Sequence, residues 1–97
     1  MITKQMTGTP SDVLVEQLVA SGVKYVFYNS GSSEALFFDA LNNNPNINGI
    51  LALHEVTVAS MAGAYTQVNA EPAVLVVHLG AGLAQCSGPL YHHRLVW

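Results

Sequence analysis

Three short, almost uninterrupted apolar runs limit what this chain can fold into more than any other feature. They cover residues 25–28, 50–53 and 73–77, and segments of helical character separate them. Runs of this length, rich in β-branched and aromatic residues, are typical of strands. Strands that are apolar on both faces and alternate with helices are typical of a parallel sheet with helices on both faces. The sequence therefore predicts an α/β fold built on a three-stranded parallel sheet.

Helix signals fill the segments around these strands. Thr9 is placed to cap a helix that begins at Pro10 and ends at Ser21 and Gly22. The glycine-rich residues 80–82 predict a tight loop after the third strand. Three further helices are expected, over residues 34–41, 56–68 and 83–91.

The composition indicates a domain that needs cover. The 97 residues are enough for one small domain. Only 9% of them are charged and 51% are hydrophobic, whereas roughly a quarter are charged in an average soluble domain. A small domain has a large surface relative to its core, so it needs polar residues outside. We therefore expect residues 1–97 to be a partial domain, covered by more of its own polypeptide or by a partner.

Charge and cysteine content exclude several classes of function. The net charge is −3, and the only strong bases are Lys4, Lys24 and Arg94, so the chain cannot form the basic patch that nucleic acid or an anionic membrane requires. Cys86 is the single cysteine, which predicts a free buried thiol in a reducing compartment. The first nine residues lack the apolar stretch of a signal peptide, and no apolar run is long enough to span a bilayer. We expect a cytoplasmic protein.

Candidate site residues follow each predicted strand. Ligands of parallel α/β sheets bind beyond the carboxyl ends of the strands, which here are residues 29–34, 54–55 and 78–82. Glu55 lies between apolar neighbours, where a carboxyl group is suited to share a proton with a bound ligand. The alternative for Glu55 is an ordinary helix N-terminal residue, which the helix dipole favours.

The other polar groups at these positions have structural alternatives too. The turn from Gly31 through Ser32 to Glu34 could hold a polar ligand with its backbone N–H groups, or it could simply cap the next helix. His78 ends the third predicted strand. A lone histidine at a strand end is more often a hydrogen-bonded structural residue than a catalyst. His92 and His93 are adjacent and have no further ligand set beside them, so they do not predict a metal site.

The order and spacing of these segments carry more information than any one of them. The stretches are V-F-Y-N-S-G-S-S-E at 26–34, I-L-A-L-H-E at 50–55, M-A-G-A-Y at 61–65 and P-A-V-L-V-V-H at 72–78. Together they resemble the N-terminal pyrimidine-binding domain of thiamine-diphosphate-dependent enzymes, in particular the benzoylformate decarboxylase and acetolactate synthase-like group. The resemblance covers about residues 12–91.

The resemblance implies a role for each candidate residue. Glu55 matches the activating glutamate that hydrogen-bonds the cofactor's pyrimidine ring and so promotes loss of the thiazolium C2 proton, which opens decarboxylation of a 2-keto acid. Ser32 matches a substrate-contacting serine, and His78 matches an active-site histidine of the decarboxylases. The positions that approach the cofactor in the family are matched by Gly31, Gly82 and Gln85.

The chain also departs from the family pattern. Ser30 stands where proline is usual, residues 63–66 replace the usual Asp-Gly-Tyr-Ala, and Gln85 stands where asparagine is usual. No Gly-Asp-Gly followed by Asn-Asn occurs, so the Mg²⁺ and the diphosphate would be bound by a part that this chain lacks.

The resemblance therefore predicts a fragment of a thiamine-diphosphate-dependent 2-keto acid decarboxylase or acetolactate synthase-like enzyme. Its expected partners are further copies of itself or a full-length relative, since the family builds its site across a dimer interface. Two alternatives stay open at this point. One is a non-catalytic interaction module that docks on a full-length relative, and the other is a degenerate, truncated product without activity.

Overall fold

The structure, a computed structural model, confirms the predicted α/β class. It describes residues 5–29 and 31–95, without the side chains of Ser32 and residues 93–95. The elements follow one another as α1 (Pro10–Ala20), β1 (Tyr25–Tyr28), a short 3₁₀ helix η1 (Ser32–Glu34), α2 (Ala35–Asn42), β2 (Asn48–Leu51), α3 (Glu55–Asn69), β3 (Val74–Val76) and α4 (Leu79–Leu95). The strands form a parallel sheet in the order β2-β1-β3.

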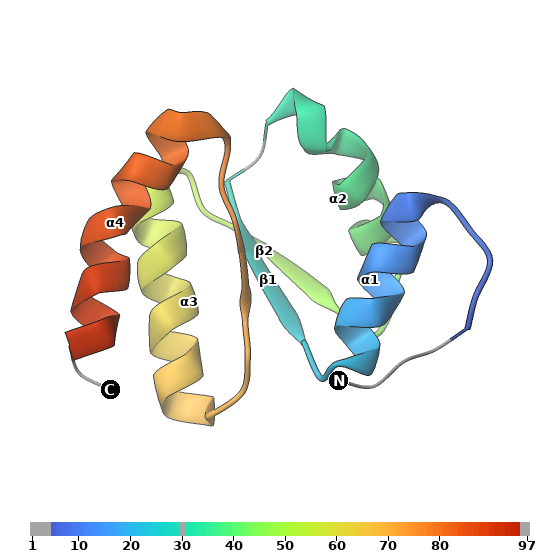
Figure 1. Ribbon diagram of the computed structural model, residues 1–97, viewed down its shortest axis with the longest axis horizontal. Coiled ribbons are helices and arrows are strands. Elements are labelled where there is room, and N and C mark those ends of the chain that lie inside the picture. Colours follow the sequence, from blue (N-terminus) through green and yellow to red (C-terminus); the bar gives the residue numbers. More distant parts are fainter. Residues whose placement is uncertain (1–4, 30, 96–97) are drawn as a thin grey trace.

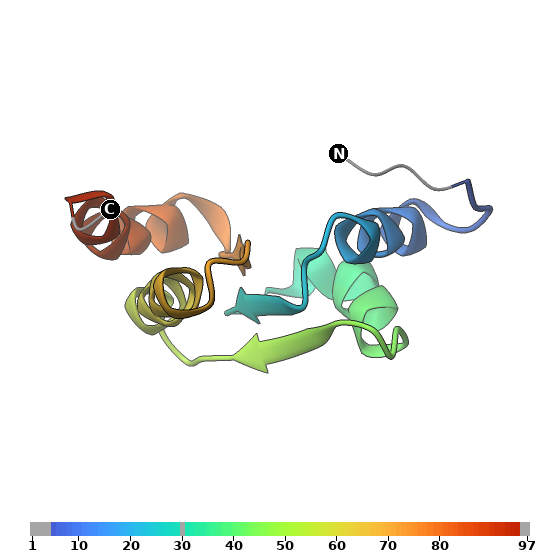
Figure 2. The ribbon, with the colours of Figure 1, turned by 90° about the horizontal axis from the view of Figure 1, so that it is seen from below.

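The helices cover both faces of this sheet, as predicted. Helices α1 and α2 pack on one face, and α3 and α4 lie on the other (Figures 1 and 2). Adjacent residues of a strand point to opposite faces. Val26 therefore belongs to the core under α1 and α2, while the next residue, Phe27, packs against α3.

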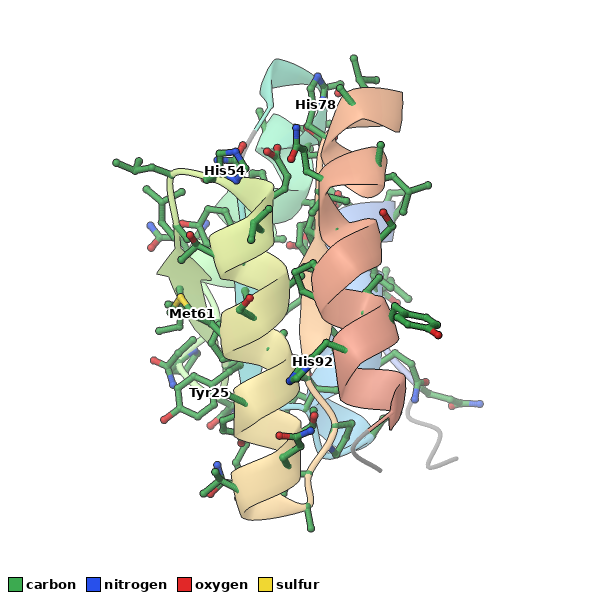
Figure 3. The ribbon with its side chains drawn as sticks, turned by 90° about the vertical axis from the view of Figure 1, so that its left-hand side faces the viewer. Tyr25, His54, Met61, His78 and His92 are labelled. Carbon is green, nitrogen blue, oxygen red and sulfur yellow. The ribbon has the colours of Figure 1, made fainter. Side chains whose placement is uncertain are left out.

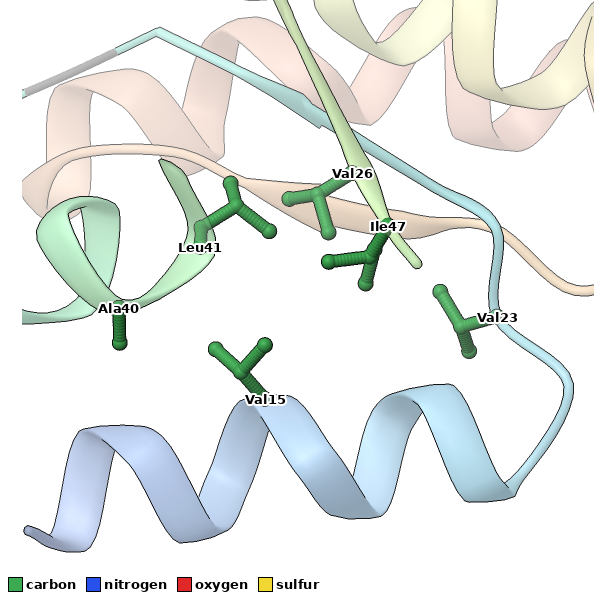
Figure 4. Packing of buried hydrophobic residues seen from close by; sticks show 6 residues of the cluster. All are labelled: Val15, Val23, Val26, Ala40, Leu41 and Ile47. Carbon is green, nitrogen blue, oxygen red and sulfur yellow. The ribbon is translucent and has the colours of Figure 1, made fainter. Parts of the chain in front are cut away.

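Each face has its own apolar core. Figure 4 shows the core between the sheet and α1 and α2, which is formed by Val15, Val23, Val26, Ala40, Leu41 and Ile47. The core on the α3 face is formed by Phe27, Ala52, Val58 and Ala62. Helix α3 packs against both the sheet and α4, and its small side chains Ala59 and Ala62 are buried.

Local signals explain where the helices begin and end. Thr9 and Asp12 form a reciprocal capping box at the start of α1, and Gly22 follows its end with a φ of 89°. His54 caps α3 by accepting a hydrogen bond from the Val56 N–H at 3.1 Å. Helix α3 ends at Ala70, which has a left-handed φ of 53°.

Three predictions about the elements are wrong. Helix α4 runs to Leu95 rather than ending at residue 91. Strand β2 is Asn48–Leu51 rather than residues 50–53, because it pairs residue by residue with the four-residue β1, and the register ends at Tyr28 and Leu51. Residues 80–82 are not a loop but the first turn of α4, where the Gly82 N–H donates to the His78 carbonyl at 3.3 Å. Packing of this turn against α3 outweighs the low helix propensity of glycine.

Candidate functional site

The carboxyl ends of the three strands meet at one edge of the sheet. Asn29, which follows β1, joins them: its N–H donates to the Val76 carbonyl at 3.2 Å, and its side-chain amide donates to the Ala52 carbonyl at 3.0 Å. These bonds fix the spacing between the segments that leave the sheet. Figure 3 shows His54 and His78 at this end of the molecule, whereas Tyr25 and His92 lie toward the other end.

Glu55 lies at this edge as the first residue of α3. Its side chain is half-buried, and within the described part of the chain its carboxylate forms no hydrogen bond or ion pair. Gly82 of α4 packs against it so closely that a Cβ on Gly82 would lie 3.1 Å from Glu55 Oε2. The absence of a side chain at Gly82 therefore leaves room for the carboxylate, and a bound ligand can reach it.

His78 occupies the end of β3 and contacts the turn after β1. Its Nδ1 lies 2.9 Å from Glu34 Oε1, and the two side chains are 29% and 25% exposed. The imidazole also packs against Gly31 so closely that any Cβ on Gly31 would overlap the ring. The structure thus brings His78 and Gly31 together.

The backbone after His78 turns sharply into α4. Leu79 has a φ of 61°, in the left-handed region that side chains other than glycine seldom adopt. This turn lets α4 begin directly after β3, so that Gly82 reaches Glu55 one helical turn later. Strained backbone of this kind gathers at sites where position matters for function.

Glu34 is a site residue that the sequence did not identify. The sequence predicts either a backbone site for a polar ligand or a helix cap in the turn that ends at Glu34, but no role for its carboxyl group, which is the partner of His78. The hydrogen bond from His78 holds the pKa of Glu34 below its usual 4.5, against the opposing effect of burial. Its other oxygen, Oε2, is buried and has no hydrogen-bond partner among the described residues. The only signal available was its position after β1, the segment where ligands bind.

The other residues that the sequence predicted for the site have fewer described contacts with Glu55 and His78. Ser32 lies in η1 beside Gly31, and its side chain is outside the described residues. Gln85 is exposed on α4, about one turn beyond Gly82. His92 lies far from the edge (Figure 3), and the side chain of His93 is not described. In the described ranges no three His, Cys, Asp or Glu residues are grouped so that they could hold a metal ion.

Cys86 is a free, buried thiol, as predicted. It packs under Glu55, and its Sγ donates a weak hydrogen bond to the Glu55 carbonyl at 3.6 Å. Burial raises the pKa of the Cys86 thiol, and the nearby Glu55 charge raises it further. The thiol therefore stays protonated and supports the start of α3 rather than acting as a nucleophile.

The group at this edge fits one half of a thiamine cofactor. Among the described residues the Glu55 carboxyl group has no hydrogen-bond partner, and such a group can share a proton with a ring nitrogen of an aminopyrimidine. For the diphosphate half, which needs Mg²⁺ held by oxygen ligands, the described residues contain no group of three His, Cys, Asp or Glu side chains that could hold a metal ion. The fit that the described residues offer is to the pyrimidine end.

The fold is a small parallel α/β domain whose candidate site lies at the carboxyl edge of the sheet. The family model for the thiamine pyrophosphate enzyme, N-terminal TPP binding domain matches residues 8–95. The chain belongs to this family.

Curated relatives are much longer than this chain. It is 34% identical over 84 residues to "Putative acetolactate synthase large subunit IlvX" of Mycobacterium tuberculosis, covering 87% of this chain and 16% of the relative. It is 34% identical over 80 residues to the sulfoacetaldehyde acetyltransferase of Castellaniella defragrans, covering 80% of this chain and 13% of that protein. It is 28% identical over 82 residues to the mitochondrial acetolactate synthase catalytic subunit of Aspergillus candidus, covering 84% of this chain and 12% of that one. The chain therefore spans less than a fifth of the length of these relatives.

No helix in the described part of the chain has both the length and the apolar character needed to cross a lipid bilayer.

Proposed function

We propose that this chain supplies the activating carboxylate, Glu55, to the aminopyrimidine ring of thiamine diphosphate in an acetolactate synthase-like or 2-keto acid decarboxylating enzyme. The observation that carries the proposal is the unpaired, half-buried Glu55 carboxylate at the carboxyl edge of the sheet, cradled by Gly82. The family supports the choice of cofactor, because its domain is described as TPP binding.

Each residue at the carboxyl edge of the sheet has a separate role in this proposal. Glu55 would share its proton with ring nitrogen N1′ of the pyrimidine and so favour the imino form of the ring, whose exocyclic nitrogen would take the C2 proton. The bound cofactor supplies an electron sink for the carbon–carbon bond that breaks. Ser32 and His78 would contact the 2-keto acid, and the lack of a side chain at Gly31 leaves room for the His78 imidazole. Gln85 approaches the cofactor from α4.

The reaction needs more polypeptide than this chain. Affinity for a diphosphate comes largely through Mg²⁺ held by carboxylate and amide oxygens. We assign those Mg²⁺ ligands to a further copy of the chain or to a longer relative. Without that anchor the reacting groups are held loosely, and a displacement of about 1 Å already lowers a rate by roughly a hundredfold. We therefore expect the isolated chain to bind the pyrimidine end weakly and to turn over no 2-keto acid.

Calorimetric titration of the chain with thiamine diphosphate and Mg²⁺ tests the binding step. Weak binding is expected for the wild-type chain, and Glu55→Gln should lower the affinity about tenfold or more, since hydrogen bonds to charged groups contribute about 1.5–3 kcal/mol. The matched control is Asp39→Asn, an exposed carboxylate of α2 away from the edge, which should bind like the wild type. Equal affinity of the Glu55→Gln and wild-type chains would contradict the proposal.

A second candidate function is a non-catalytic interaction module, and the free side of β3 favours it. In the described part of the chain β3 ends the sheet, so one row of its backbone groups has no strand beside it. Beside it lies a groove of about 310 Å³ lined by Leu14, Leu18, Glu34, Phe37, Val74 and Val76. Such a surface suits a further strand from a full-length relative. Binding to that relative by the Glu55→Gln chain, with no effect of either chain on turnover, would favour this candidate.

A further inference from the structure

The hydrogen bond between Glu34 and His78 has a direction that the chemistry of its partners determines. Nδ1 of His78 lies 2.9 Å from Oε1 of Glu34, the distance of a charge-assisted hydrogen bond. The pKa of Glu34 lies below its usual 4.5, so this carboxyl is ionised at neutral pH. An ionised carboxylate can only accept hydrogen bonds. The proton in this bond therefore belongs to Nδ1 of His78.

We propose that Glu34 is a positioning residue that holds neutral His78 in the Nδ1–H tautomer and so presents an unprotonated Nε2 at the carboxyl edge of the sheet. The use of that Nε2 by a ligand rests on the function proposed above, whereas the tautomer itself does not.

The packing around the pair leaves the imidazole little freedom to turn. Gly31 touches the ring on one side, where no Cβ could be accommodated. Glu34 Oε2 is buried and has no hydrogen-bond partner among the described residues. The hydrogen bond between Oε1 and His78 therefore helps to offset the free-energy cost of burying this carboxylate. Breaking that bond would leave a partly buried charge unsatisfied. The carboxylate and the imidazole therefore hold each other in place.

The tautomer decides what His78 can do with a ligand. A carboxylate on Nδ1–H orients the imidazole and stabilises the positive charge that forms when Nε2 takes a proton. Among the described residues Nε2 has no hydrogen-bond partner. It is therefore available to accept a proton or a hydrogen bond from a bound 2-keto acid and to return the proton later. The opposite tautomer would make Nε2 a donor and remove this basic position.

His54 provides a comparison within the same chain. Its Nδ1 accepts a hydrogen bond from the Val56 N–H at 3.1 Å, so Nδ1 must be unprotonated. Neutral His54 therefore carries its proton on Nε2. The structure thus assigns opposite tautomers to two histidines at one end of the molecule.

The test is the pattern of imidazole ¹⁵N chemical shifts of the full chain, without cofactor, at about pH 9, where imidazoles are neutral. We expect the His78 Nδ1 to show the shift of a protonated nitrogen and its Nε2 that of an unprotonated one, with the reverse for His54. In Glu34→Ala the His78 pattern should reverse to mainly Nε2–H while His54 is unchanged. Asp39→Ala, which removes an exposed carboxylate from the neighbouring helix, should leave both patterns as they are.

Two results would overturn the proposal. One is an Nε2–H tautomer of His78 in the wild-type chain, which needs no variant to detect. The other is an Nδ1–H tautomer that persists in a Glu34→Ala chain whose His54 pattern shows that it is folded. Neither result depends on thiamine diphosphate, so a failure here is distinct from a failure of calorimetric binding.

Discussion

Single side chains, present or missing, determine what this edge can bind. Glu55 and Gly82 show this most directly, because the carboxylate occupies space that a methyl group on Gly82 would reach. A Cβ there would lie 3.1 Å from Oε2 and 3.3 Å from Cγ of Glu55. Gly80, in the same helical turn, would place its Cβ in open space. The two glycines therefore separate an effect on the site from an effect on the helix.

We predict that Gly82→Ala displaces the Glu55 carboxylate by a few tenths of an ångström and weakens binding of thiamine diphosphate several-fold. Gly80→Ala should leave binding unchanged and raise the free energy of unfolding by up to about 1 kcal/mol, since alanine favours a helix over glycine. Calorimetry gives the affinities, and urea denaturation gives the stabilities. Equal loss of affinity in both variants would show that the helix, not the carboxylate, is responsible.

We predict that the Glu34–His78 hydrogen bond makes the free energy of unfolding fall at acid pH. The folded-state pKa of Glu34 is lowered below 4.5 by the His78 hydrogen bond. The stabilisation is therefore present above about pH 4.5, the ordinary value, and is lost as the pH falls through the lower folded-state pKa. In His78→Leu, which removes the largest cause of this lowering, the pKa of Glu34 should rise above its wild-type value.

The ¹³C shift of the Glu34 carboxyl measures this pKa. The control is His54→Leu, which removes an exposed histidine that does not touch Glu34. It should weaken the cap of α3 and leave the Glu34 titration unchanged. If His78→Leu also left it unchanged, the described hydrogen bond would not be the cause of the low pKa.

At the scale of the elements, the sequence predicted which segments are helices or strands better than it predicted the residues at which they begin and end. All three strands and four α-helices were expected near their positions, because continuous apolar runs and capping residues are strong local signals. The start of α4 was missed, since Gly80 and Gly82 indicate a loop by propensity. In this turn Gly82 packs against Glu55 of α3, which is a tertiary contact that no local pattern contains. The pairing of Glu34 with His78 was missed for the same reason, because 44 residues separate the two.

The end of α3 offers a prediction of its own. Ala70 adopts a φ of 53° at the C-cap, where its Cβ is unfavourable. We predict that Ala70→Gly raises the free energy of unfolding by about 1 kcal/mol, because glycine is the usual residue of a left-handed helix cap. Ala64→Gly, at an exposed position inside α3, is the control and should lower stability by a similar amount. A loss of stability in both variants would contradict the left-handed cap.

On the scale of the whole molecule, the described residues expose apolar surface on α4 and beside β3. Leu79, Leu83 and Leu90 of α4 are 72%, 61% and 46% exposed, and they recur at the spacing of one helical stripe. The free side of β3 and the groove beside α1 add to this apolar surface. Low charge predicted such a surface, but its location on β3 and α4 required the fold. Exposed apolar area of this kind marks sites of association.

We propose that this chain contributes Glu55 to an active site whose remaining residues belong to a further copy or a longer relative. The most direct measurement is the turnover of 2-keto acid by a relative that lacks the segment matched by residues 8–95, co-expressed and purified with this chain, with thiamine diphosphate and Mg²⁺ added. We expect turnover to appear with the wild-type chain and with Asp39→Asn, and to fall by at least about a hundredfold with Glu55→Gln although the complex still forms. A complex in which Glu55→Gln supports the same turnover as the wild-type chain would contradict this proposal.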